Sequence, residues 1–221
     1  PFETLQPHTM KRRSLLQPLA HGLTALALCA TLGLPQAMAQ TAPRVKFTTS
    51  MGEFVVEVYP DKAPKTVDNF LQYVRDKHYD GTVFHRVISN FMVQGGGYDA
   101  RYREKPSRAP VAHEGREALS KGGARNTVGT LAMARTNDPN SAKAQFFINV
   151  QDNAKLDYPN NGGYAVFGSV VEGMEVVDRI KSTPTGTGKM KMLHPTTGEA
   201  IEIPAENVPN TAVTILNATL E

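Results

Sequence analysis

Short stretches in which apolar residues alternate with polar ones recur along the chain, and turn-forming residues separate them. Residues 45–48 and 54–59 are rich in β-branched and aromatic side chains, and Gly52 between them supplies a turn, so a β-hairpin is predicted here. The same features predict further strands at 83–88, 91–94, 128–134, 146–150, 166–171 and 213–216.

Helical spacing of apolar residues occurs in two places. Val67, Phe70, Leu71 and Val74 fall at i, i+3, i+4 and i+7, which predicts an amphipathic helix with one apolar face. A second, shorter helix with the same kind of spacing is predicted to end near Lys181. Many short strands and two helices predict a mainly β fold, in which a closed antiparallel barrel has its ends covered by the helices.

Two segments of this domain do not follow the simple pattern. Residues 95–127 contain many glycines and charges with little periodicity, which predicts a long loop that is functional or flexible. Basic residues outnumber acidic ones in it; a solvated loop face is the favoured interpretation, and an anion-binding patch is the alternative. Residues 189–192 and 200–203 alternate apolar and polar across a turn with Pro195 and Gly198, which predicts an extra hairpin.

The first 39 residues differ in composition from the rest. Three basic residues follow Met10, then comes a mostly apolar run that ends at Leu34, and then Ala-Met-Ala at 37–39. These are the parts of a secretory signal peptide, so we expect cleavage after Ala39 and a periplasmic location. The unbroken apolar part is too short to span a membrane, which disfavours an anchor. A lipid anchor on Cys29 is also disfavoured, because a bulky leucine precedes it.

The expected organisation is a leader over 1–39, a linker over 40–44 and one domain over 45–221. Residues 1–9 precede the methionine and are interpreted as a non-native or overextended start. Removing the leader leaves 21 basic and 20 acidic residues, a net charge of about +1, so charge gives no reason to expect a nucleic-acid partner. We expect neither nucleic-acid nor, after cleavage, membrane association, and a monomer.

The usual chemical motifs are absent from the sequence. The single cysteine excludes a disulfide within the chain and a thiolate metal cluster. There is no Gly-x-Ser-x-Gly nucleophile turn and no phosphate-binding loop, and His78, His85 and His113 are not at metal-ligand spacing. We therefore expect neither a metal nor another cofactor. A hydrolase or metalloenzyme is disfavoured for the same reason.

One segment is dense in candidate site residues. Residues 84–96 place Arg86, Phe91, Met92 and Gln94 next to a pair of glycines. Phe91 and Met92 taken singly are compatible with an ordinary core strand. Arg86 is harder to explain in that way, because a guanidinium among apolar residues needs a partner or a cleft.

The motifs of the domain resemble those of the cyclophilin family of peptidyl-prolyl isomerases, and in particular of a secreted bacterial member. Phe-His-Arg at 84–86 and Phe-Met-Val-Gln-Gly-Gly at 91–96 match the family's signature. Gly-Thr-Leu-Ala-Met-Ala at 129–134, Gln-Phe-Phe-Ile at 145–148 and Val-Phe-Gly at 166–168 are similar to further family segments in the same order.

The resemblance implies an eight-stranded antiparallel closed barrel capped by two α-helices, with a substrate groove on its outer face. Arg86 then corresponds to the catalytic arginine, while Gln94 and Gln145 hold the peptide backbone. Ala134 and Arg135 correspond to positions that bind the residue before proline through the main chain. The implied proline pocket is lined by Phe91, Met92, Phe147 and Leu156, and Met133 and Tyr164 complete the implied substrate-binding set.

Two positions depart from many eukaryotic members of the family: Lys155 stands where they have tryptophan, and Tyr164 where they have histidine. The chain has no tryptophan at all. Because the tryptophan helps to bind the inhibitor cyclosporin, the resemblance implies weak cyclosporin sensitivity.

The resemblance thus implies a peptidyl-prolyl cis-trans isomerase that assists the folding of exported, proline-containing polypeptides. Rotation about a proline peptide bond breaks no covalent bond, so it needs neither nucleophile nor cofactor, in agreement with the absence of the usual motifs. A peptide-binding module or chaperone without activity is the alternative, and the presence of Arg86 favours the enzyme.

Overall fold

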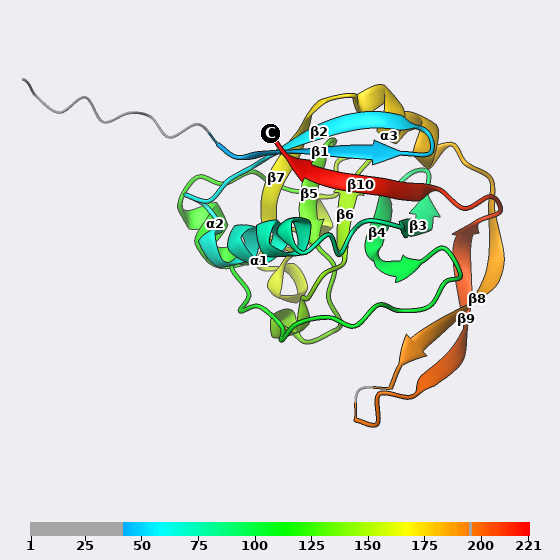
Figure 1. The fold of residues 1–221 in the computed structure, drawn as a ribbon. Coiled ribbons are helices and arrows are strands. Elements are labelled where there is room, and N and C mark those ends of the chain that lie inside the picture. The colour runs from blue at the N-terminus through cyan, green and yellow to red at the C-terminus, as the bar shows by residue number, and fades with distance from the viewer. Residues whose placement is uncertain (1–41, 195) are drawn as a thin grey trace, which may run out of the picture. The chain divides into compact units, whose positions relative to one another are not determined.

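The computed structural model describes residues 42–194 and 196–221, and its main feature is a closed β-barrel (Figure 1). Neighbouring strands follow the order β1-β10-β3-β4-β6-β5-β7-β2 and pair antiparallel throughout. The predicted mainly β fold with an eight-stranded antiparallel barrel is confirmed. The strands are β1 (Arg44–Thr49), β2 (Gly52–Val58), β3 (Thr82–Ile88), β4 (Met92–Asp99), β5 (Thr130–Met133), β6 (Phe146–Asn149), β7 (Val166–Glu172) and β10 (Thr214–Leu220).

Aromatic rings fill the barrel interior. Phe47 on β1 stacks on Phe54 of β2, with 5.0 Å between ring centroids, and also contacts Phe146 of β6 at 5.5 Å. Phe70 lies edge-on to Phe146 and 5.0 Å from Phe167. All five rings are buried, so each contributes a large apolar area to the stability of the fold.

Both predicted helices are present and pack on this core. α1 (Pro64–Arg75) buries the predicted apolar face, and α3 (Met174–Lys181) buries Val176, Val177 and Ile180. A third helix that the sequence did not predict, α2 (Gly115–Ser120), lies in the predicted loop 95–127. This helix has six residues and buries only Gly115 and Ala118, which is too short a segment to show helical periodicity in sequence.

Glu114, just before α2, holds the start of α1. Its buried carboxylate accepts hydrogen bonds from the main-chain N–H of Lys65 at 3.2 Å and of Thr66 at 2.8 Å, and from the Thr66 hydroxyl at 2.8 Å. These N–H groups have no partner within the helix, and the helix dipole favours a negative charge there. The contact ties the long 95–127 segment to the barrel.

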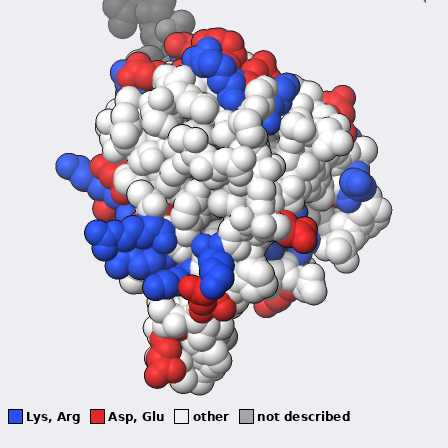
Figure 2. Space-filling view, turned by 90° about the vertical axis from the view of Figure 1, so that its right-hand side faces the viewer, with Lys and Arg blue, Asp and Glu red and all other residues white. Residues whose placement is uncertain are grey.

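The extra hairpin predicted around residues 189–203 is confirmed and is longer than expected. β8 (Thr185–Leu193) and β9 (Ala200–Pro209) form a separate two-stranded sheet that extends beyond the barrel (Figures 1 and 2). Its distal half, where Leu193 pairs with Ala200, is fastened to the segment after β4: the Glu104 N–H donates to Lys191 O at 2.7 Å, and the Leu193 N–H donates to the Glu104 carboxylate at 2.8 Å. Pro195, in the predicted turn, lies outside the described residues.

The predicted leader and Cys29 also lie outside the described residues, so the predictions about them remain predictions. In 42–194 and 196–221, no helix combines the length and apolar character needed to cross a membrane.

Candidate active site

A bulge in β3 sets the direction of Arg86. Phe84 pairs with Gly95 and Arg86 with Gln94, so His85 is an extra residue on its strand. Phe84 and Val87 consequently both join the interior cluster, while Arg86 lines a hollow on the outer face. Bulges commonly redirect side chains in this way next to active sites.

Side chains that alternate between the interior and the outside along strands such as β6 form an apolar patch on the outside of the barrel. On β6, Phe146 and Ile148 point into the interior while Phe147 between them joins a second, smaller cluster. That outer cluster consists of Met92, Ala132, Phe147 and Val166, with Ile88, Phe91, Ala124, Ala134, Leu156 and Tyr164 packed against it. An apolar patch beside a polar rim on a barrel surface is typical of a binding site.

The outer cluster surrounds a hollow of about 100 Å³. Met92 and Phe147 are buried, whereas Phe91 and Leu156 are half-buried. The rings of Phe147 and Tyr164 meet edge to face with 5.6 Å between centroids. Such a hollow fits a small apolar ring. The residues lining it are Arg86, Phe91, Met92, Gln94, Ala134, Arg135, Phe147, Leu156 and Tyr164.

Three hydrogen-bonded polar side chains lead away from this hollow, and two of them, Arg86 and Gln94, line it. The Arg86 guanidinium donates to Gln94 Oε1 at 3.5 Å, and Gln94 Nε2 donates to Gln145 Oε1 at 3.0 Å. In the described part of the chain, no carboxylate pairs with Arg86. A neutral amide orients the guanidinium without neutralising it, so its remaining N–H groups can donate to a ligand.

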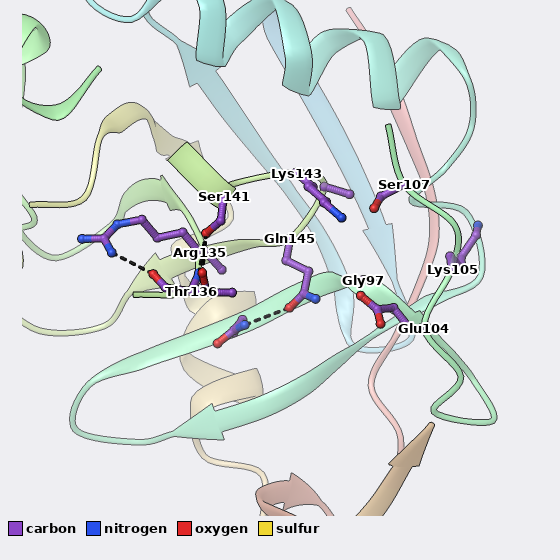
Figure 3. Close-up of a pocket in the computed structure, with 12 residues that line it drawn as sticks. Gly97, Glu104, Lys105, Ser107, Arg135, Thr136, Ser141, Lys143 and Gln145 are labelled. Carbon is purple, nitrogen blue, oxygen red and sulfur yellow. Dashed lines mark hydrogen bonds between the residues drawn. The ribbon is translucent and has the colours of Figure 1, made fainter. Parts of the chain in front are cut away.

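A second hollow of about 310 Å³ continues from the first and shares Gln94, Ala134 and Arg135 with it. Figure 3 shows Gln145 lying between Ser141 on one side and Glu104 on the other. Because they share these residues, the two hollows together form one groove on the outer face of the barrel.

Arg135 joins two segments beside the groove. Its guanidinium donates to the main-chain oxygens of Asn161 at 2.6 Å and Gly163 at 2.9 Å, and its charge lies 4.3 Å from the centroid of the Tyr164 ring. A cation over an aromatic face is attractive. The side chain of Arg135 thus fixes Tyr164 at the border of the smaller hollow.

Nine of the eleven residues proposed from the sequence line the smaller hollow, and Gln145 lines the larger one. Met133 differs: its side chain is 3% exposed, belongs to the interior cluster and lines neither hollow. Lys155 is exposed on a short 3₁₀ helix (Ala154–Leu156), directly beside Leu156 of the smaller hollow.

Sequence reasoning missed the outer wall of the larger hollow, namely Glu104, Lys105, Ser107 and Lys143. The excess of basic residues in 95–127 is a signal for Lys105, but a solvated loop face is the favoured interpretation of that excess. The placement of this segment depends on Lys105, whose Nζ donates to the main-chain oxygen of Asp80, and on the contacts of Glu104 with β8. Across the described ranges, no three His, Cys, Asp or Glu side chains cluster as metal ligands would.

His85, the bulge residue, gives a pH prediction. Burial lowers its pKa to about 4, with the neighbouring Arg86 charge acting in the same direction. Between about pH 6.5 and 4, the unfolded chain therefore binds a proton at His85 that the folded chain does not, so stability falls as the pH falls. We expect His85 to contribute about 3 kcal/mol to the loss in unfolding free energy from pH 7 to pH 4.

The measurement is urea unfolding at several pH values for the wild type and for His85→Phe, which keeps a ring 4.6 Å from Tyr98. Below pH 6.5 the unfolding free energy of His85→Phe should decrease less steeply with falling pH than that of the wild type. Identical pH profiles would contradict the assignment.

Comparisons with known proteins identify the class to which this fold and groove belong. Residues 44–218 match the family model of cyclophilin type peptidyl-prolyl cis-trans isomerases. The chain is 54% identical to "Peptidyl-prolyl cis-trans isomerase cyp18" of Streptomyces antibioticus over 149 residues, 66% of this chain and 87% of that protein. It is 44% identical to "Peptidyl-prolyl cis-trans isomerase B" of Escherichia coli over 175 residues, 77% of this chain and 98% of that protein.

Solved structures agree on the fold. A cyclophilin from Cryptosporidium parvum superposes with a TM-score of 0.59 at 20% identity, covering 81% of this chain and 98% of that one. A second crystal structure, of the same protein in the presence of the dipeptide Ala-Pro, gives a TM-score of 0.58 at 21% identity and covers 80% of this chain and 98% of that one. The chain belongs to the cyclophilin family, and it is a peptidyl-prolyl cis-trans isomerase.

Proposed function

We propose that this isomerase acts on proline-containing segments of exported polypeptides, and that Arg86 accelerates the rotation by stabilising a twisted amide. The observation that carries the mechanism is the position of Arg86 at the edge of an apolar hollow of about 100 Å³. The Ala-Pro dipeptide used with the Cryptosporidium relative belongs to the same ligand class.

The chemical problem is amide resonance. It opposes rotation about the bond before proline with a barrier of ~18–20 kcal/mol, so the uncatalysed exchange takes tens to hundreds of seconds. In the transition state the amide is twisted, and the prolyl nitrogen becomes pyramidal and regains a lone pair. A catalyst therefore has to bind this twisted form more tightly than either planar isomer.

The site provides groups for both halves of this task. Phe91, Met92 and Phe147 can hold the proline ring, while an Arg86 N–H donates to the lone pair that develops on the prolyl nitrogen. Gln94 and Gln145 can hold the peptide main chain beside it. Each ~1.4 kcal/mol of stabilisation specific to the twisted form gives a tenfold higher rate.

A protease-coupled isomerisation assay on an X-Pro peptide tests the proposal directly. The chain starting at Gln40 should accelerate cis-trans exchange without added metal, and a chelator should leave the rate unchanged. A rate that falls on chelation would contradict the cofactor-free mechanism.

The exported location is a separate part of the proposal and is supported by the leader sequence alone. The basic residues after Met10, the apolar run and Ala-Met-Ala at 37–39 fit a cleaved signal peptide. We expect mass spectrometry of protein recovered from the periplasm to show Gln40 as the N-terminal residue, and Ala39→Arg to block this processing. Recovery of folded protein with an intact Met10 terminus from the cytoplasm would contradict export.

A further inference from the structure

Beneath the smaller hollow lies a group of buried polar side chains that neither the sequence motifs nor the mechanism uses. We call Asn126, Asn149, Asn153 and Asp157 the amide network. Their exposed fractions are 1%, 0%, 2% and 4%, respectively, and none of them lines either hollow. Polar groups buried to this degree are costly unless each is hydrogen-bonded, so their partners indicate what the network does.

The four residues bond to one another in a continuous chain. Asn153 Nδ2 donates to Asn149 Oδ1 at 2.7 Å, and Asn149 Nδ2 donates to Asn126 Oδ1 at 3.2 Å. Asn126 then donates to Asp157 Oδ1 twice, from its main-chain N–H at 2.8 Å and from its side chain at 2.9 Å. Asn149 belongs to β6, so the chain is anchored in the barrel itself.

The outward bonds of the network reach the main chain of three residues that line the smaller hollow. Asn153 Nδ2 donates to Phe91 O at 2.8 Å, and Asn126 Nδ2 donates to Tyr164 O at 3.3 Å. The Leu156 N–H donates to Asn153 O at 2.8 Å, and the Tyr164 N–H donates to Leu156 O at 2.8 Å. The network therefore connects three walls of the hollow to each other and to the barrel.

None of these three walls is in a strand, so the network adds to the few main-chain bonds that hold them, such as that from the Val150 N–H to Phe91 O at 3.2 Å. Phe91 lies in the turn between β3 and β4, Leu156 in a 3₁₀ helix and Tyr164 in the segment before β7. Met92 and Phe147, the other large apolar walls, are held by the sheet. Loop walls without internal bonds would sample several positions, and a hollow of about 100 Å³ holds a proline ring only if its walls stay in place.

We propose that the amide network positions the walls of the isomerase site. It holds Phe91, Leu156 and Tyr164 in fixed positions around the proline ring. The inference rests on the assignment of the smaller hollow as the proline pocket. It assigns no contact with substrate to the network, whose effect on catalysis is transmitted through the walls. Asn153 is the central member, because its side chain links Phe91 directly to Asn149 on the barrel.

The test starts from Asn153→Ala, which removes both side-chain donations. We expect kcat/KM on an Ala-Pro tetrapeptide to fall on the order of 10-fold at a temperature where circular dichroism shows the variant to be folded. Asn153→Ser keeps one donor and disturbs packing less, so its kcat/KM should lie between those of Asn153→Ala and the wild type. It also provides the measurement if the alanine variant does not fold.

Thr49→Val is the matched control. It removes a buried hydroxyl that donates to Gly52 O at 2.8 Å, in the turn between β1 and β2, and Thr49 lines neither hollow. This variant should lose stability with kcat/KM unchanged. An equal loss of activity in the control would mean that destabilisation alone explains the effect, which would overturn the proposal.

A double-variant cycle separates positioning from a general structural role. Once Phe91→Ala has removed the wall that Asn153 holds, adding Asn153→Ala should lower kcat/KM by less than about 2-fold, because coupled residues are not additive. A further 10-fold loss in the double variant, or full activity in folded Asn153→Ala, would overturn the proposal. An inactive wild type would instead contradict the isomerase assignment, so the two failures are distinguishable.

Discussion

Replacing Arg86 by alanine is expected to lower kcat/KM for an X-Pro peptide on the order of 100-fold while the barrel stays folded. The guanidinium donates to a lone pair that exists only in the twisted amide, so its loss raises the transition state and leaves the bound planar peptide almost unaffected. A hydrogen bond from a charged donor contributes about 1.5–3 kcal/mol, and about 2.7 kcal/mol corresponds to a factor of 100. The measurement is the protease-coupled assay, with peptide affinity measured separately by titration.

Two further variants make this result interpretable. Arg86→Lys keeps the charge but loses the planar set of donors that is bonded to Gln94, so it should recover only a small part of the activity. Arg75→Ala removes an exposed arginine from the last turn of α1, outside both hollows, and should leave kcat/KM unchanged. Wild-type turnover in a folded Arg86→Ala protein would remove Arg86 from the mechanism.

The strands of the barrel were predictable because their alternation is a local property of the sequence. The direction of Arg86 was not predictable from that alternation, since simple period-two counting from Phe84 would place Arg86 inside with it. The bulge at His85 reverses the inward and outward alternation of side chains along β3. The bulge depends on the pairing of β3 with β4 rather than on any single residue. The cost of burying a guanidinium among apolar residues indicates a partner or a cleft for Arg86, and the resemblance to the family indicates that this cleft is the groove.

For the rest of the site as well, the sequence alone could not predict which residues come together. The walls contributed by Phe91, Leu156 and Tyr164 were named from family motifs, but nothing local to them predicts that they meet. The contacts that join them run through Asn126 and Asn153, which are 27 positions apart in the sequence. Asparagine in a loop ordinarily indicates a turn, so a buried role of this kind becomes visible only when the long-range partners are known.

Cyclosporin is expected to inhibit this isomerase weakly, because of the residue beside Leu156. The resemblance implies that many eukaryotic family members share this proline pocket but have tryptophan where Lys155 stands, and that this indole helps to bind the inhibitor. Lys155 is exposed, directly precedes Leu156 of the smaller hollow, and offers a flexible stem with a hydrated charge. It replaces neither the flat apolar face of an indole nor its N–H donor.

Losing aromatic area together with a hydrogen bond costs on the order of 2–4 kcal/mol, or roughly 30- to 1000-fold in affinity. Catalysis should be unaffected by this difference, since Arg86 and the apolar walls Phe91, Met92 and Phe147 are present. The measurement is the inhibition constant of the unmodified enzyme in the same isomerisation assay. Tight nanomolar inhibition would show that the indole is dispensable and would contradict the argument.

Substitution at the same position gives the complementary result. Lys155→Trp should strengthen cyclosporin inhibition at least 10-fold while kcat/KM for the peptide changes by less than about 2-fold. Lys121→Trp is the matched control, since it adds an indole at an exposed position just after α2 that lines neither hollow. Because this control should leave inhibition unchanged, a gain confined to Lys155→Trp would locate the inhibitor at the border of the proline pocket, next to Leu156.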